Sequence, residues 1–364
     1  MLPLPKSSVL NQNLDRGMLN HVVARDPSVL WLDKNENTDP ILAKLIGRLL
    51  KEIDPIHCLS VYPELSDFYI RLSNYLEVPD SNIIISTGSD GVIRSVFEAY
   101  CSDGDKVMIT NPTYAMYEVY SLMYGANLIK YDYLATQDGP LLDFSGFLNE
   151  IKRTQPKLIF IANPDSPTGT ILEESKLVEA IKLAAEIGAL IAIDEAYFPF
   201  YSHSMINYTH SYENLIVIRT FSKAWGLAGL RVGYGVGAPE VINMLRKVKP
   251  NYETNSIGVE IATKMLEYEN EVLASVKRLN EGRDYFLSKM QEFGLETIRA
   301  NASFLHVKFG AYEKEIHEAL SKIVLYRHGF NQNCLKDFSR FSSTSKEIFE
   351  PIVNCIGHIV QGKK

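Results

Sequence analysis

Three features are scarce in this chain of 364 residues, and the first of them is cysteine. The four cysteines, Cys58, Cys101, Cys334 and Cys355, are widely scattered, and no two form a C-x-x-C pair. Structural zinc centres and dithiol redox sites usually need such pairs, so we expect neither a metal site nor a disulfide framework. Isolated thiols are typical of a reducing compartment, which favours a cytoplasmic protein.

Long apolar runs are the second scarce feature. The most apolar stretch, residues 181–200, is interrupted by four charged side chains. A membrane-spanning helix needs about 20 apolar residues and rarely tolerates such charges. The first residues, MLPLPKSSVLNQNLDRG, also lack the apolar centre of a secretory signal. We therefore expect no membrane association.

An excess of positive charge is the third. The chain has 37 Lys and Arg against 44 Asp and Glu, a formal net charge of -7. Proteins that bind nucleic acid neutralise phosphates with basic residues, so a nucleic-acid partner is not expected. A G-x-G-x-x-G string opening a helix after a first strand is also missing, which disfavours a dinucleotide-binding dehydrogenase.

What the chain does contain is a series of short apolar runs separated by amphipathic segments. The runs are rich in β-branched residues and do not alternate with polar ones, which is typical of strands buried on both faces of a parallel sheet. Residues 173–187 have helical spacing, and strands alternating with helices indicate an α/β sheet covered on both sides. The runs are 83–85, 107–109, 158–161, 190–193 and 215–218.

The C-terminal third has a different pattern. A long helical pattern begins near Ile257, and residues 303–309 alternate as in a strand with one face toward water. We therefore predict two domains: a large one over residues 31–254, with a mostly parallel sheet covered by helices, and a smaller α+β domain formed by 1–30 and 255–364.

Polar and ionisable residues follow each apolar run of the predicted sheet. In open α/β sheets, ligands bind beyond the carboxyl ends of the strands, so these residues should meet at one edge. Each has an ordinary interpretation when taken alone: a turn, a helix cap or a surface lysine. The segments are 86–91 (STGSDG), 111–114 (NPTY), 163–169 (NPDSPTG), 194–197 (DEAY) and 220–223 (TFSK), with Arg231 shortly after.

Two of these segments carry a resemblance to a known family. The strings DEAY at 194–197 and TFSKAWGLAGLRVGY at 220–234 resemble the core of class I/II aminotransferases, which are fold-type I enzymes that use pyridoxal 5'-phosphate (PLP). The likeness is nearest to the histidinol-phosphate aminotransferase branch, which also contains threonine-phosphate decarboxylase. It extends from LDKNEN at 32–37 to about Arg340.

The resemblance implies a role for each matching residue. Lys223 would carry the cofactor as a Schiff base and shuttle a proton, and Asp194 would pair with the pyridine nitrogen. Tyr197 would bind the ring hydroxyl, either with a hydrogen bond from Ser166 as well or alone, and Tyr114 would stack on the ring. The residues expected around the cofactor phosphate are Ser89, Asp90, Ser222 and Arg231.

It also implies a partner and a substrate. Tyr62 resembles a tyrosine that reaches the cofactor phosphate of a neighbouring subunit, which predicts a homodimer with shared sites. Arg340 stands where the family binds the substrate carboxylate, a task suited to a bidentate guanidinium. Arg327 resembles an arginine that contacts the distal phosphate of the substrate.

The chain departs from the family at four places. Ser166 stands where an asparagine is usual, and Ser303 replaces another asparagine near the substrate. Residues 198–200 (FPF) lack the usual acidic residue, and the N-terminal segment lacks an aromatic residue that helps to bind histidinol phosphate. These differences concern the substrate more than the cofactor.

The functional prediction is transamination of a small, phosphorylated amino or carbonyl compound. The alternative within the same family is decarboxylation of a phosphorylated amino acid. A third interpretation is a regulatory module that kept the fold without catalysis, but too few residues precede Asp33 for a DNA-binding domain.

Overall fold

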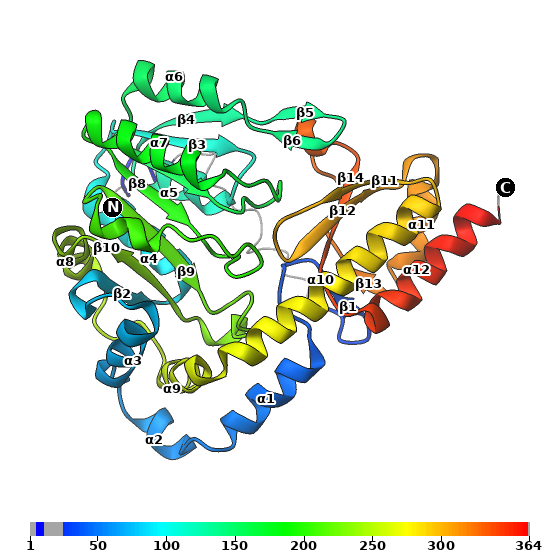
Figure 1. The fold of residues 1–364 in the computed structure, drawn as a ribbon, viewed down its shortest axis with the longest axis horizontal. Helices are drawn as coiled ribbons and strands as arrows, with labels where there is room; N and C mark the ends of the chain where they lie inside the picture. The colour runs from blue at the N-terminus through cyan, green and yellow to red at the C-terminus, as the bar shows by residue number, and fades with distance from the viewer. Residues whose placement is uncertain (1–4, 11–24, 363–364) are drawn as a thin grey trace.

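The computed structural model describes residues 5–10 and 25–362 and has a larger and a smaller part (Figure 1). The larger part is built on a seven-stranded sheet in the order β2-β10-β9-β8-β7-β3-β4. Only β10 runs antiparallel to its neighbours within this sheet. The strands are β2 (Ile83–Ser86), β3 (Lys106–Asn111), β4 (Asn127–Asp132), β7 (Leu158–Ala162), β8 (Leu190–Asp194), β9 (Leu215–Thr220) and β10 (Gly233–Gly237).

Both faces of the sheet are covered, because neighbouring residues of one strand enter different cores. Ile83 and Ile85 pack with one set of helices, while Ile84 packs with another. This is why the runs read as continuously apolar. One core contains side chains of α1 (Pro40–Leu50), α3 (Ser66–Leu76), α6 (Phe144–Thr154), α7 (Glu174–Glu186) and α9 (Ser256–Met265); the other contains those of α4 (Gly88–Tyr100), α5 (Ala115–Met123) and α8 (Pro239–Val248).

The smaller part is a three-stranded antiparallel sheet, β11-β12-β14, with helices packed on it. The long helix α10 (Glu269–Glu292) connects the two parts and packs against α12 (Lys346–Gln361) (Figure 1). The remaining elements here are β11 (Glu296–Arg299), β12 (Phe304–Lys308), β14 (Phe338–Ser342) and α11 (Glu313–Leu320).

Two expectations for this region were wrong. The helical pattern beginning near Ile257 forms two helices, α9 and α10, because a 3-10 turn at Leu266–Tyr268 separates them. Strand β12 also has no wet face, since Phe304 through Val307 are all buried. Leu305 and Val307 pack toward α10 and α12, while Phe304 packs beside Tyr197 of the larger part.

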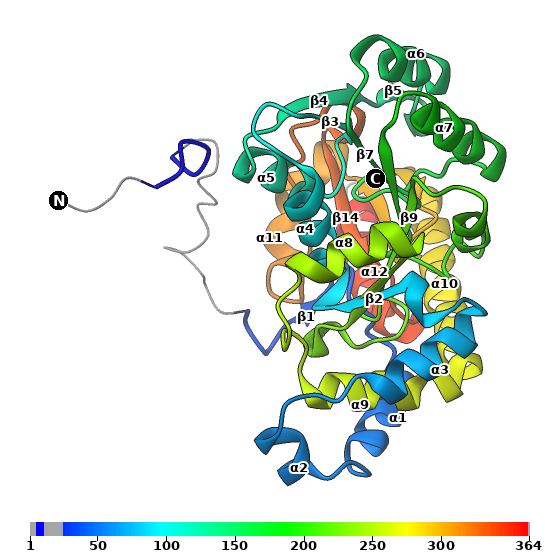
Figure 2. The same ribbon diagram turned by 90° about the vertical axis from the view of Figure 1, so that its left-hand side faces the viewer.

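The N-terminal residues belong partly to each unit. Strand β1 (Leu30–Trp31) pairs in parallel with β13 (Val324–Leu325) of the smaller part, and α1 then packs against α9 of the larger part. Most of the segment 1–30 predicted to join the small domain, namely 1–4 and 11–24, lies outside the described residues. The short elements still to be placed are α2 (Pro55–Ser60), seen projecting in Figure 2, and the hairpin of β5 (Leu134–Thr136) and β6 (Gly139–Leu141).

No helix in the described part of the chain is long and apolar enough to cross a bilayer. The same residues contain no group of three or more His, Cys, Asp or Glu side chains placed to hold a metal ion.

Candidate active site

The polar segments that follow β2, β3, β7, β8 and β9 line one cavity of about 630 Å³. Residues of β14 and of the loop after β13 close it from the smaller part, so both parts contribute to it. The cavity contains all but one of the site residues predicted from the sequence: Ser89, Asp90, Tyr114, Ser166, Asp194, Tyr197, Ser222, Lys223, Arg231, Arg327 and Arg340.

Asp194 ends strand β8 at the floor of this cavity and is 3% exposed. One carboxylate oxygen accepts a hydrogen bond of 2.7 Å from the Tyr117 hydroxyl, and the other accepts one of 3.0 Å from the backbone N–H of Ala196. Burial nevertheless raises the pKa of Asp194 to about 6. A cation placed against this carboxylate would therefore be held strongly, because it would restore the ionised form.

Lys223 lies in the turn after β9 and is partly open to the cavity. Its Nζ donates a hydrogen bond of 2.8 Å to the backbone carbonyl of Lys34. Burial, together with the charges of Arg340 and Arg231, lowers the pKa of Lys223 to about 8. A substantial fraction of this amine is thus neutral near physiological pH, as a nucleophilic lysine requires.

An anion cradle lies at the N-terminus of α4. The side chain of the N-cap residue Thr87 makes no capping hydrogen bond. The first N–H groups of the helix therefore face the cavity without an acceptor from that side chain. Arg231, in the left-handed region at φ 53°, places Nη2 only 2.8 Å from where a Cβ on Gly88 would be. Its Nη1 also donates to Ser222 Oγ at 3.3 Å. These donors converge as a phosphate group needs.

The two aromatic residues of the site differ in exposure. Tyr114 is 36% exposed and its hydroxyl donates to Asp90 at 3.4 Å, so its ring stands at the cavity wall. Tyr197 is buried, and its hydroxyl accepts a hydrogen bond of 2.8 Å from Asn35 Nδ2. Burial raises the pKa of Tyr197, while the charge of Arg340 and hydrogen bonds to Ser166 and Asn35 act against that rise.

Arg340 and Arg327 are cross-strand neighbours. Their backbones exchange two hydrogen bonds, of 2.7 and 3.0 Å, and both side chains line the cavity. Arg340 is 8% exposed; its Nη2 donates to the carbonyl of Asp33, but its Nε has no partner among the described residues. Burial lowers the pKa of Arg340, and Arg327 lowers it further. An anion between these side chains would relieve both effects.

Tyr62 is the one predicted site residue outside the cavity. Its side chain is 70% exposed and stacks on Tyr252, with ring centroids 4.2 Å apart. Within one chain it contacts none of the cavity residues named above.

Sequence reasoning missed three residues that support the site. Tyr117 binds Asp194, and Asn35 binds Tyr197. Asp165 is fully buried and accepts hydrogen bonds from Thr113 and Thr168, so it ties the loop before Tyr114 to the turn that carries Ser166. Asp165 stands beside Ser166 in NPDSPTG and Asn35 stands in LDKNEN, but no sequence signal marked Tyr117.

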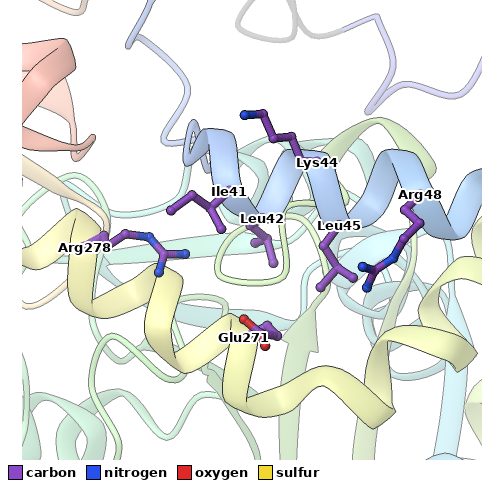
Figure 3. Close-up of a pocket in the computed structure, with 7 residues that line it drawn as sticks. All are labelled: Ile41, Leu42, Lys44, Leu45, Arg48, Glu271 and Arg278. Carbon is purple, nitrogen blue, oxygen red and sulfur yellow. The ribbon is translucent and has the colours of Figure 1, made fainter.

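A second, smaller cavity of about 260 Å³ lies between α1 and α10 (Figure 3). It mixes apolar side chains with Arg48, Glu271 and Arg278, and Arg278 is already paired with Asp39 at the N-cap of α1. None of the predicted site residues reaches it.

Comparison with known proteins agrees with this geometry. Residues 27–351 match the family model for aminotransferase class I and II. The histidinol-phosphate aminotransferase of Caldanaerobacter subterraneus subsp. tengcongensis is 30% identical over 349 residues, which cover 95% of this chain and 97% of that protein.

Solved structures show the same fold at lower identity. The histidinol-phosphate aminotransferase from Sinorhizobium meliloti, in complex with PLP, aligns with a TM-score of 0.79 and 20% identity, covering 100% of this chain and 99% of that one. The L-threonine-O-3-phosphate decarboxylase from Porphyromonas gingivalis aligns with a TM-score of 0.75 and 17% identity, covering 92% and 100%.

The chain therefore belongs to the class I/II aminotransferases and has the fold of a fold-type I PLP enzyme, as predicted from the sequence. Within that class it is a PLP-dependent aminotransferase of the histidinol-phosphate aminotransferase type, which acts on amino substrates.

The cavity fits PLP in chemical terms. It offers a buried carboxylate for the pyridine nitrogen, a partly neutral lysine amine for the aldehyde, and a cradle that a Cβ on Gly88 would fill for the phosphate. The aromatic wall at Tyr114 completes the set.

Proposed function

We propose that this enzyme transfers an amino group between an amino acid donor, such as glutamate, and a small phosphorylated amino or carbonyl compound. The observation that carries this proposal is the pair Arg327 and Arg340, which face the same cavity as Lys223. Two adjacent guanidinium groups suit a substrate with an anionic group at one end. The names of the relatives make histidinol phosphate the first compound to test.

Each residue then has one task. PLP, when bound, supplies an aldehyde and an electron-accepting ring, which together weaken the bonds at the amino-bearing carbon of the substrate. Asp194 would keep the pyridine nitrogen protonated, with Tyr117 fixing its carboxylate. Tyr197 and Ser166 would hold the ring hydroxyl, and Tyr114 would stack on the ring.

The remaining tasks concern anchoring and proton transfer. Arg231, Ser222 and the N-terminus of α4 at Ser89 and Asp90 would hold the phosphate of the cofactor. The amine of Lys223 would hold the cofactor covalently and, once freed, would carry a proton at Nζ.

The decisive experiment supplies one amino compound without an acceptor. Purified holoenzyme should lose its visible cofactor absorbance and accumulate the amine form of PLP when given L-glutamate or L-histidinol phosphate. Borohydride should fix the cofactor on Lys223, and Lys223→Ala should abolish turnover. Turnover by that variant would contradict the assignment.

The two arginines can be tested separately. Arg340→Ala should raise the KM for glutamate on the order of a hundredfold, because a bidentate charged contact is lost. Arg327→Ala should instead act mainly on phosphorylated substrates. If Arg340→Ala binds glutamate normally, its carboxylate role is wrong.

Decarboxylation is the second candidate, because the same two arginines could hold the carboxylate and the phosphate of a phosphorylated amino acid. Incubation with O-phospho-L-threonine distinguishes the two reactions. Release of carbon dioxide without formation of the amine form of PLP would favour the decarboxylase.

A homodimer with shared sites is part of the proposal. Tyr62 lies beside exposed apolar residues of α2, Ile56 and Leu59, which are 77% and 74% exposed. Such a patch favours contact with another protein surface, and a second copy would bring Tyr62 to the cofactor phosphate of its partner. The four free thiols also support a reducing, cytoplasmic location.

A further inference from the structure

Three consecutive residues between β1 and α1 each contact a different predicted site residue. Their backbone and side-chain atoms lie within ordinary hydrogen-bond distance of the partners. The contacts are Arg340 Nη2 to Asp33 O at 3.0 Å, Lys223 Nζ to Lys34 O at 2.8 Å, and Asn35 Nδ2 to Tyr197 OH at 2.8 Å.

Asn35 is the member of this segment that contributes its side chain. Its backbone is in the left-handed region at φ 58°, which asparagine adopts more readily than most residues. The smaller part fixes this conformation: Ser342 Oγ accepts from the N–H of Asn35 at 2.8 Å, and Ser303 Oγ donates to its carbonyl at 3.3 Å. The direction of the Asn35 side chain is thus set from β14 and from the residue that precedes β12.

The two ends of the Asn35 amide are used differently. Nδ2 donates to the Tyr197 hydroxyl, whereas Oδ1 is buried and has no hydrogen-bond partner in the described part of the chain. Asn35 is 3% exposed and lines the cavity. Leaving a buried amide oxygen unpaired is unfavourable, so the site is built for a donor that arrives with the substrate.

The Tyr197 hydroxyl also contacts a side chain of the larger part. That side chain is Ser166, whose hydroxyl is short and offers a single donor. Asn35 brings an amide N–H to the same phenolic oxygen from another segment, since Tyr197 contacts both side chains.

We propose that Asn35 is a positioning and specificity residue: its Nδ2 holds the Tyr197 hydroxyl, and its Oδ1 accepts a hydrogen bond from an N–H or O–H group of the substrate. This inference rests on the proposed function of the cavity and adds a residue to it.

Two variants test the role of the Asn35 side chain and should keep the left-handed backbone conformation of this residue. Asn35→Asp keeps the shape of the side chain but removes the N–H donor. Asn35→Gly keeps the left-handed φ but removes both the donor and the acceptor. Each should lower kcat/KM about three- to tenfold for every neutral hydrogen bond lost. Each should also move the pH midpoint of the bound-cofactor absorbance by about half a unit or more, because the Tyr197 hydroxyl loses a donor.

Glu77→Gly is the matched control. Glu77 also has a positive φ, of 56°, but it is exposed at the end of α3 and contacts none of the cavity residues. It should keep wild-type kcat/KM and a wild-type midpoint. Wild-type values in both Asn35 variants would overturn the proposal.

The outcomes also distinguish this inference from the proposed function. A wild-type protein that binds no PLP or gives no amine form with any donor would refute the function itself. A wild-type enzyme with the expected half-reaction, together with Asn35 variants altered only in thermal unfolding, would refute the role of Asn35 alone.

Discussion

His306 is a fully buried side chain on β12, directly opposite Arg340 in the register of the small sheet. Neither ring nitrogen has a partner of normal hydrogen-bond geometry among the described residues. Burial, together with the charge of Arg340, lowers the pKa of His306 to about 3. The folded protein therefore holds a neutral imidazole behind its predicted carboxylate-binding arginine.

A pH-dependent stability follows from this histidine. The pKa of His306 is about 6.5 in the unfolded chain and lower in the folded protein. Its contribution to the unfolding free energy is therefore fully present above pH 6.5 and is lost as the pH falls toward about 3. His306→Leu should flatten the decline of the unfolding free energy below about pH 6.5, by on the order of a few kcal/mol. Urea unfolding across this range measures it.

The exposed His210 provides the comparison. His210→Gln should follow the wild-type curve, because its side chain is solvated in both states. A His306→Leu protein with the same acid dependence as wild type would rule out the buried neutral imidazole as its cause.

Lys223 gives a second prediction at this scale. Only the neutral amine can attack the aldehyde of PLP, and the pKa of Lys223 is about 8. The rate of covalent capture of PLP by the apoprotein should rise about tenfold per pH unit below that pKa and level off above it. Stopped-flow absorbance would follow this rate. A rate still rising near pH 10 would indicate a lysine of ordinary pKa.

Single residues were predictable from the sequence when they stand directly after a strand. Asp194 and Lys223 end or follow apolar runs, so the sheet topology brings them to one edge. Asn35 and His306 could not be found in this way. Their partners come from segments more than thirty residues away: Tyr197 lies in the larger part, and Arg340 lies on a neighbouring strand of the small sheet.

At the scale of elements, strand β10 determines where the N-terminus of α4 can lie. A Cβ on Gly233 would be 2.4 Å from both the Gly88 carbonyl carbon and the Ser89 nitrogen. Only glycine permits this approach of β10 to the turn that carries the anion cradle.

Gly233→Ala should displace that turn and weaken PLP binding at least about tenfold, since the phosphate donors would no longer converge. Titration of the apoprotein with PLP measures the change in Kd. Gly229→Ala is the control, because a Cβ there meets nothing within 4 Å. Equal Kd values for the two variants would contradict the proposed cradle.

The same strand shows the limit of pattern reading for elements. Five strands were predicted because their runs are β-branched and apolar, and all five lie in the large sheet. The sequence GYGVG of β10 is rich in glycine and suggests a turn instead. It nevertheless forms a strand between β2 and β9, because its small side chains leave room for α4 beside it. The prediction that one face of β12 is exposed to water was wrong for a related reason, because the larger part covers that face.

For the whole molecule, the proposed homodimer gives the clearest test. Ile56 and Leu59 of α2 are apolar and highly exposed, and α2 projects from the body of the chain (Figure 2). Replacing both by Asp should shift the protein from twice the chain mass of 41.1 kDa toward a single chain, because desolvating two carboxylates is costly. Light scattering of the purified protein measures this mass.

Turnover of this double variant should fall together with its measured mass, because Tyr62 would no longer reach the partner's site. Leu141→Asp is the matched control: Leu141 is 54% exposed on the hairpin of β5 and β6, far from α2 in Figure 1. A monomeric wild-type protein with full activity would refute the shared site.

The segment Asp33–Asn35 has a consequence for the length of the chain between β1 and α1. Successive residues there serve Arg340, Lys223 and Tyr197, while β1 is anchored on β13 and α1 begins at Pro40. Inserting or deleting one residue would offset all three contacts together, although none of the partner side chains would be touched. Natural variation and engineering should therefore tolerate exchange of the Lys34 side chain, which contributes only its backbone carbonyl, far better than any change in the number of residues of this linker.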